Sequence, residues 1–121
     1  MVARLVLVGL AVAAVVVGAT SLRTDHRCSN AVRAVSIVPK GELMTAARAV
    51  TDRCGDTLTA VRASQTLFLR GGAPPALVIA RRLTRSHPDD YLGWISTWRL
   101  TGDRAALARA RELNPRGTPT G

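Results

Sequence analysis

The fold is decided by residues 72–115, which read GAPPALVIARRLTRSHPDDYLGWISTWRLTGDRAALARARELNP. Three runs with the apolar periodicity of helices alternate there with short segments rich in proline, glycine and aspartate. Proline and glycine occur mainly at the joints, where they end one helix or open the turn into the next. Alanines recur on the apolar side of each run and let neighbouring helices approach closely. This pattern predicts an all-α fold of antiparallel helical hairpins stacked on one another.

The composition agrees with thin helical layers. The chain has 121 residues, of which 47% are apolar and only 3% aromatic, so alanine, valine and leucine have to build its core. A chain of this length makes one small domain beside its N-terminal segment. The net charge of +9 comes almost entirely from arginine, because Lys40 is the only lysine. Such a composition is typical of GC-rich coding, so the charge by itself does not establish a binding surface.

The N-terminal segment, residues 1–22, is expected to enter a membrane. No charged residue occurs from Leu5 to Leu22. A helix of that length reaches about 27 Å, close to the roughly 30 Å of bilayer hydrocarbon, which favours an uncleaved transmembrane signal anchor. The alternative is a secretory signal peptide cleaved after Ala19, where Val17-Gly18-Ala19 forms a passable site. Arginines are nearly balanced on the two sides of the segment and do not decide its orientation.

The rest of the chain divides into residues 23–115, the expected helical domain, and residues 116–121, an expected flexible tail. A polar junction at 21–25 should separate the anchor from the first helix of the domain, with Thr24 or Asp25 as its N-cap. A turn at residues 39–41 should follow that helix.

Six helices are expected in the domain, and aspartates should cap three of them. Asp56 precedes the third helix, Asp89 or Asp90 the fifth, and Asp103 the sixth. The apolar contacts of the third helix are expected to be Leu58, Val61, Phe68 and Leu69, although Gln65 interrupts this stripe. The six helices should form three hairpins: 25–38 with 43–54, 57–70 with 73–87, and 91–101 with 103–113.

The two cysteines of the chain lie at the outer ends of the first two predicted helices, on apolar stripes that face each other. Antiparallel pairing brings Cys28 and Cys54 together opposite the turn, where a disulfide would close a loop of about 26 residues. The alternative is a pair of free buried thiols. An export-type N-terminus and an even number of cysteines favour the disulfide, which would place the domain outside the cytoplasm.

Similar segments recur along the domain. Residues 30–34, NAVRA, echo residues 59–63, TAVRA. The expected caps Asp56 and Asp89 are 33 positions apart, a spacing typical of helical repeats. In the second helix of each hairpin an Ala-Arg pair recurs: Ala47-Arg48, Ala80-Arg81 and Ala108-Arg109.

This pattern resembles the tetratricopeptide-repeat superfamily in a degenerate form. The likeness is best over residues 89–115, looser over 57–88, where Ala76, Ala80 and Pro88 fit, and limited to the helix layout over 25–54. The third unit is shorter than the usual 34 residues, so a generic helical array is the alternative. The resemblance implies a scaffold for protein–protein contacts with no chemistry of its own. The signature-like residues of the best-matching unit are Trp94, Gly102, Asp103, Leu113, Asn114 and Pro115.

Three aromatic residues, Tyr91, Trp94 and Trp98, share one face of the fifth predicted helix. At spacings of three and four residues such side chains usually pack into a core, and we favour that interpretation. The alternative is a groove in which they bind a protein partner, because tryptophan often anchors interfaces.

Arginines are concentrated in the fourth and sixth predicted helices. The ordinary interpretation is a solvated helix face. The functional one is a patch for an anionic partner, such as lipid headgroups, an acidic envelope polymer or an acidic protein. No recognised nucleic-acid-binding motif occurs, so no nucleic acid partner is expected. The candidate residues of this patch are Arg81, Arg82, Arg85, Arg104, Arg109 and Arg111.

No catalytic, cofactor-binding or metal site is expected. His26 and Cys28 are close in sequence, but no Cys-x-x-Cys pair accompanies them, and no base is placed beside a nucleophile. The sequence therefore predicts a non-enzymatic, membrane-anchored helical module on the extracytoplasmic side that binds an unidentified protein. The alternative is a basic structural protein that associates with anionic lipid headgroups or an envelope polymer.

Overall fold

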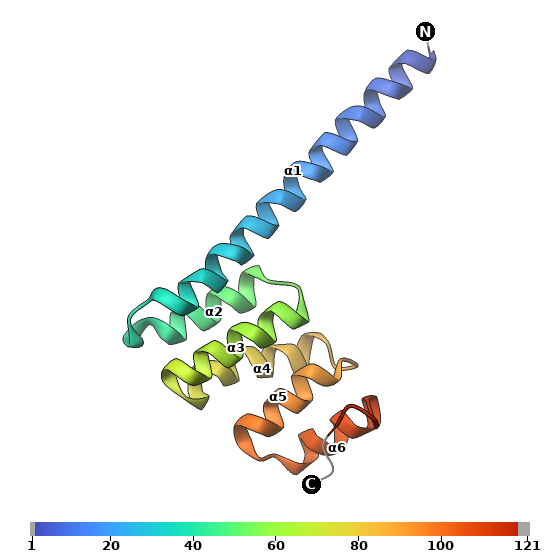
Figure 1. Cartoon of the computed structure of the whole chain (residues 1–121). Coiled ribbons are helices and arrows are strands. Elements are labelled where there is room, and N and C mark those ends of the chain that lie inside the picture. The colour runs from blue at the N-terminus through green and yellow to red at the C-terminus, as the bar shows by residue number, and fades with distance from the viewer. Residues whose placement is uncertain (1, 119–121) are drawn as a thin grey trace.

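The computed structural model describes residues 2–118, without the side chains of residues 2, 3, 5, 7, 9, 20, 21 and 24. All regular structure in this part is helical, which confirms the predicted all-α class (Figure 1). The elements are α1 (Val2–Ile37), the 3₁₀ turn η1 (Lys40–Glu42), α2 (Leu43–Arg53), α3 (Thr57–Gly71), α4 (Ala73–Ser86), α5 (Tyr91–Thr101) and α6 (Arg104–Leu113).

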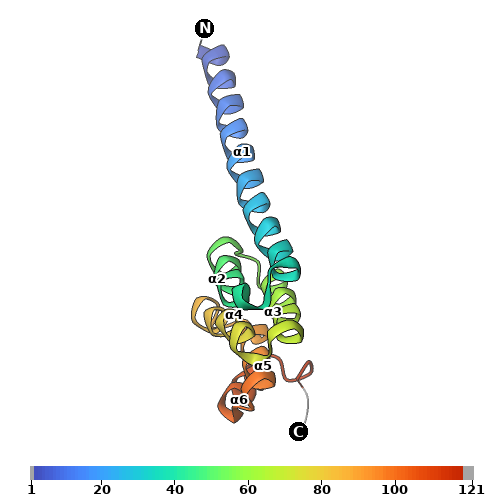
Figure 2. The same cartoon turned by 90° about the vertical axis from the view of Figure 1, so that its left-hand side faces the viewer.

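Helix α1 is a single helix of 36 residues, and its first half stands clear of the other helices (Figures 1 and 2). The junction expected at residues 21–25 does not interrupt it, so the expectation that Thr24 or Asp25 begins a new helix is wrong. No proline or glycine occurs between Ala19 and Ile37. The backbone hydrogen bonds therefore continue, and no N-cap is needed there.

The free half of α1 exposes apolar side chains. Val12, Val15 and Val17 have exposed fractions of 58%, 70% and 64%. Within the described part of the chain, however, no helix has both the length and the apolar character that crossing a membrane requires. The anchor expected over residues 1–22 falls partly on residues whose side chains lie outside the description.

The helices pack as consecutive pairs, α1 with α2, α3 with α4, and α5 with α6. Helices α1, α3 and α5 also contact one another in sequence, α2 packs against α4, and α4 packs against α5, so the three pairs form one continuous array. Figure 2 shows the hairpins following one another away from the free end of α1.

The main core is rich in alanine, as the composition predicts. Ala47, Val50, Leu67, Ala76 and Ala80 are fully buried. A second, smaller cluster lies between α5 and α6 and consists of Ile95, Leu107 and Ala110.

Helix α3 buries a different face from the one that its sequence predicts. Of its four expected contacts, only Val61 is buried, whereas Leu58 and Phe68 are each 47% exposed and Leu69 is 84% exposed. The buried side instead carries small residues, which let neighbouring helices approach closely. Among these, the Ser64 hydroxyl donates to the Ala76 carbonyl oxygen of α4 at 3.2 Å. The buried residues of α3 are Ala60, Val61, Ala63, Ser64 and Leu67.

The aspartate caps are confirmed. The carboxylates of Asp56, Asp90 and Asp103 accept hydrogen bonds from backbone N–H groups two or three residues ahead, at 2.9, 3.0 and 2.9 Å. The fifth helix is thus capped by Asp90 and not by Asp89. At the other end of that helix Gly102 adopts φ 73°, the left-handed conformation that glycine accommodates without strain.

Residues 116–118, the described part of the expected tail, contact the end of α6. Thr118 is buried, and its hydroxyl donates to the carbonyl oxygens of Asn114 at 2.7 Å and Ala110 at 3.3 Å. The Ala110 carbonyl oxygen also accepts from the backbone N–H of Asn114 at 2.9 Å, so Thr118 adds a second donor at the end of α6. Residues 119–121 lie outside the description.

The third Ala-Arg pair is not equivalent to the first two. Ala47 and Ala80 are completely buried, whereas Ala108 is exposed and α6 buries Ala106 and Ala110 instead. The shorter third unit therefore places α6 in a different register from α2 and α4.

Candidate functional site

The predicted disulfide between Cys28 and Cys54 is confirmed, with sulfur atoms 2.09 Å and Cα atoms 4.8 Å apart. It joins the part of α1 that enters the domain to the residue that ends α2. Cross-links of this span stabilise folded proteins by about 3 to 4 kcal/mol in the chain-entropy account.

A second link holds α1 to the domain, and sequence reasoning did not find it. Arg70 of α3 donates from Nη1 to the Val35 carbonyl oxygen at 2.7 Å and from Nη2 to the Val38 carbonyl oxygen at 2.6 Å. Val35 lies in the last turn of α1 and Val38 directly follows the helix, where carbonyls lack helical partners and the helix dipole favours a cation. No local sequence signal marks this pair, because 35 and 32 positions separate its members.

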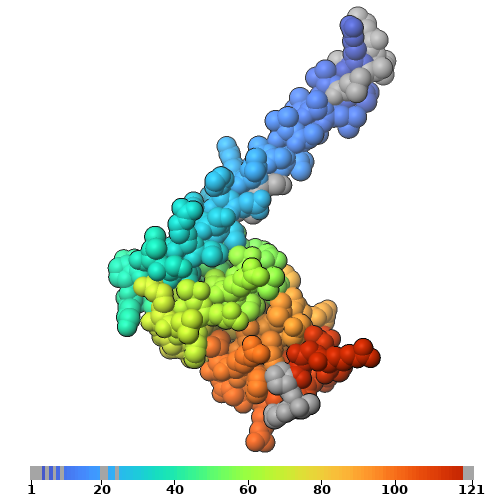
Figure 3. Space-filling view, in the orientation of Figure 1, coloured from blue at the N-terminus to red at the C-terminus, as the bar shows by residue number. Residues whose placement is uncertain are grey.

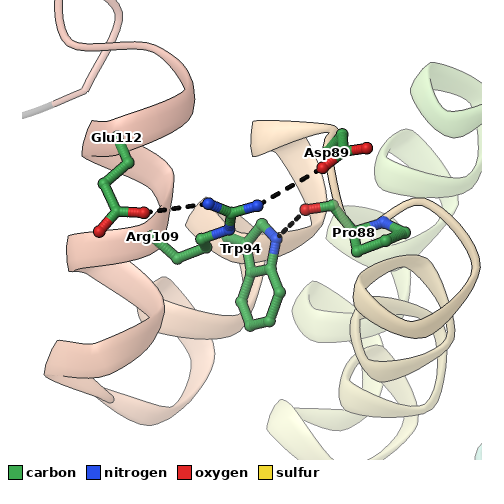
Figure 4. Close-up of polar contacts among 5 residues, drawn as sticks. All are labelled: Pro88, Asp89, Trp94, Arg109 and Glu112. Atoms are coloured by element: carbon green, nitrogen blue, oxygen red, sulfur yellow. Dashed lines mark hydrogen bonds and ion pairs between the residues drawn. The ribbon is translucent and has the colours of Figure 1, made fainter.

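The aromatic candidates all lie on α5 and are half-buried. Tyr91, Trp94 and Trp98 pack against the cluster of Ile95, Leu107 and Ala110, on the side of α5 that faces α6. The indole N–H of Trp94 donates to the Pro88 carbonyl oxygen at 2.8 Å (Figure 4). These contacts give the three side chains a packing role in the last hairpin.

One arginine of the expected patch is engaged within the domain. Arg109 of α6 lies between two carboxylates, with Nη1 3.0 Å from Glu112 Oε2 and Nη2 3.4 Å from Asp89 Oδ1 (Figure 4). The pair with Asp89 connects α6 to the corner between α4 and α5. Both pairs are solvent-exposed, and such pairs contribute at most about 1 kcal/mol.

The remaining arginines of the patch are exposed and come from two helices. Arg81, Arg82 and Arg85 lie on α4, and Arg104 and Arg111 lie on α6. Both helices pack against α5, and α4 also packs against α2, which carries the exposed Arg48. In the described part of the chain, Arg81, Arg82 and Arg85 form no ion pair.

A groove between α3 and α5 has mainly apolar walls that include large exposed side chains. It has a cavity volume of about 380 Å³. Phe68 and Leu69 of α3 form one wall and Leu100 of α5 the other, while Ser64 and Ser96 leave space between them. The remaining lining residues are Gln65 and Arg99. In the sequence, only Gln65, which interrupts the apolar stripe of α3, indicates this groove. The rotation of α3 depends on its packing partners, so the sequence alone does not predict it.

The two helices that form this groove carry charges of one sign. Helices α3 and α5 contain three arginines and no aspartate or glutamate. The Arg70 guanidinium group is hydrogen-bonded to carbonyl oxygens at the end of α1, whereas Arg62 and Arg99 are exposed. Arg99 forms no ion pair within the described residues.

The titratable groups point to structural roles. The hydroxyl and the backbone N–H of Thr59 donate to Asp56 Oδ2 at 2.6 and 2.9 Å, and these bonds lower the pKa of the Asp56 carboxyl. The two histidines, His26 and His87, are exposed. Among the described residues, no three His, Cys, Asp or Glu side chains lie close enough together to hold a metal ion.

Comparison with known proteins adds no family to this description. No family model matches the chain, and neither the curated proteins nor the solved structures contain a significant match. The resemblance to tetratricopeptide repeats therefore rests on the residue pattern.

Proposed function

We propose that the protein is a non-enzymatic helical module, attached to a membrane by its N-terminal segment and exposed on the extracytoplasmic side, where it binds another protein. The observation that carries this proposal is the free half of α1, an apolar helix that continues without a break into a disulfide-linked domain.

The membrane attachment is supported by the surface of that helix. Residues 5–22 contain no charge. Val12 and Val15 lie on one side of the helix and Val17 lies on the opposite side, and each is more than half exposed. Exposed apolar side chains on opposite sides of a helix favour an apolar environment over water, which supports the attachment.

The extracytoplasmic side is supported by the disulfide. Cytoplasmic reductants keep thiols reduced, and structural disulfides persist in oxidising compartments. Cys28 and Cys54 are the only cysteines of the chain, and both are consumed in this bond.

The assignment of a repeat scaffold is supported by equivalent positions in successive hairpins. The caps Asp56 and Asp90 are 34 positions apart, the length of a tetratricopeptide repeat. Thr51 and Thr84 also correspond, because their hydroxyls donate to the carbonyl oxygens of Arg48 and Arg81, three residues earlier, at 2.7 and 3.0 Å. Stacked helical hairpins of this kind commonly present protein-binding surfaces.

Extraction of membranes tests the attachment. Alkaline carbonate should leave the full chain in the membrane pellet, whereas the double variant Val12→Arg, Val15→Arg should be released. Each arginine near the centre of a spanning helix costs about 2.5 to 3.5 kcal/mol. Ser36→Arg, on the exposed part of α1 within the domain, is the matched control and should stay in the pellet. Release of the unmodified chain by carbonate would refute the attachment.

A second candidate function is association with an anionic surface, favoured by the exposed Arg81, Arg82 and Arg85 of α4. Charge attraction of this kind is screened by salt over about 8 Å at physiological ionic strength. Release of the full chain from membranes by moderate salt alone would therefore favour this candidate over the anchored module.

A further inference from the structure

We propose that the groove between α3 and α5 binds an amphipathic helix of a partner protein, one that carries acidic residues beside its apolar face. The proposal names the partner chemistry for the protein-binding module proposed above and rests on that function. It locates the binding surface away from Tyr91, Trp94 and Trp98, which pack toward α6.

Large apolar side chains are exposed along one face of the domain. Phe68 is 47% and Leu69 84% exposed, and both line the groove with Leu100. Figure 3 shows that the surfaces of α3 (yellow-green) and α5 (orange) meet on the same face of the domain. Neighbouring exposed apolar residues around a concavity are typical of a surface that a partner covers.

The shape of the groove suits the side chains of a helix. The small side chains of Ser64 and Ser96 leave a hollow of about 380 Å³ between the larger walls, enough to receive a few apolar side chains. The described part of the chain contains no strand whose edge an extended peptide could join. A helix that inserts side chains three and four positions apart is therefore the suitable occupant.

The charge of the groove is positive. Arg99 lines it and forms no ion pair within the described residues, and neither α3 nor α5 contains a carboxylate. A partner with acidic residues flanking its apolar stripe would gain attraction and faster association, whereas a basic partner would be repelled.

The probe that tests the proposal is a fluorescent synthetic helix with a leucine stripe flanked by glutamates. Its binding to the full chain in mild detergent is measured by fluorescence anisotropy. A second peptide with lysines in place of the glutamates reports on charge. The acidic peptide should bind and saturate, and the basic peptide should bind about tenfold more weakly or not at all.

Three variants locate the site. Leu69→Gln and Phe68→Gln should each weaken binding of the acidic peptide about tenfold or more, and Arg99→Glu should reverse the preference between the two peptides. Leu58→Gln is the matched control, because Leu58 lies on the same helix with the same 47% exposure as Phe68 but does not line the groove. It should leave binding within about twofold. Leu69 is so exposed that its replacement leaves the fold intact, which circular dichroism verifies.

The proposal is overturned if the acidic peptide does not bind, if Leu58→Gln and Leu69→Gln weaken binding equally, or if the basic peptide binds as well as the acidic one. Each of these results leaves the membrane attachment untouched, since carbonate extraction measures that property independently. If carbonate releases the full chain but the acidic peptide still binds, the proposed anchoring is refuted and the proposed binding site in the groove stands.

Discussion

At the scale of single residues, Arg70 shows how one long side chain joins hairpins that are distant in sequence. Its guanidinium group bridges two carbonyl oxygens at the end of α1 while its backbone belongs to the last turn of α3. The planar fork of arginine matches two acceptors at once, which a lysine ammonium cannot do in the same way. Together with the Cys28–Cys54 disulfide, this side chain holds the end of α1 against the domain.

Replacing Arg70 by glutamine should lower the free energy of unfolding by about 2 to 3 kcal/mol, because two hydrogen bonds from a charged donor are lost. Urea unfolding of the full chain in mild detergent, followed by circular dichroism, measures the change. Arg62→Gln is the control on the exposed side of the same helix and should change stability by less than about 0.5 kcal/mol. Equal effects of the two substitutions would contradict the role given to Arg70.

Asp56 provides a prediction about pH. The hydrogen bonds from Thr59 lower its pKa below the ordinary value of 3.8. Its contribution to stability is therefore fully present above that value and is lost as the pH falls through the lowered pKa. NMR titration should find the carboxyl titrating below 3.8, and Thr59→Ala should raise its pKa because the largest cause of the shift is removed. A titration at or above 3.8 in the unmodified protein would show that the cap does not favour the ionised form.

At the scale of elements, close approach between helices depends on small residues. Gly93 of α5 is buried against α4, and a Cβ atom there would lie 3.0 Å from Leu83 Cβ and 3.1 Å from the Thr84 backbone nitrogen. Neither atom can rotate away, because one is the first side-chain atom and the other is backbone. The absence of a side chain at this position therefore sets the distance between the two helices.

Gly93→Ala should destabilise the protein by about 1 to 3 kcal/mol through overpacking. The comparison is Gly55→Ala, at a position where an added Cβ meets no atom within 4 Å, and this change should be neutral or slightly stabilising. Thermal unfolding of both variants and of the unmodified protein measures these changes in stability. A Gly93→Ala protein as stable as the original would mean that α5 can shift away from α4 without cost.

What the sequence predicted well is local. The three aspartate caps, the hairpin pairing and the Cys28–Cys54 bond follow from spacing and turn chemistry over a few tens of residues. The rotation of α3 and the Arg70 bridge depend on neighbours that sequence periodicity does not identify. The unbroken α1 was missed because polar residues such as Asp25 are suitable caps but are also tolerated on an exposed helix surface.

At the scale of the whole molecule, the free half of α1 is joined to the domain by one continuous helix. The disulfide at Cys28, the Arg70 bridge and the buried Ala31 and Val35 hold the second half of α1 in the domain. Because the helix does not bend at a junction, its first half inherits the orientation of the domain (Figure 1). The proposed attachment would thus present the groove between α3 and α5 at a defined orientation to the membrane.

Lys40 allows the most direct test of the central claim that this domain lies outside the cytoplasm. It is the only lysine of the chain, it is exposed in η1, and it lies at the end of the first hairpin remote from the free half of α1. A membrane-impermeant amine-reactive biotin reagent, added to intact spheroplasts that express the full chain, should label it. The label should disappear in Lys40→Arg, whose only primary amine is the amino terminus, expected on the other side. Labelling of Lys40 only after the membrane is lysed would place the domain in the cytoplasm and contradict the account.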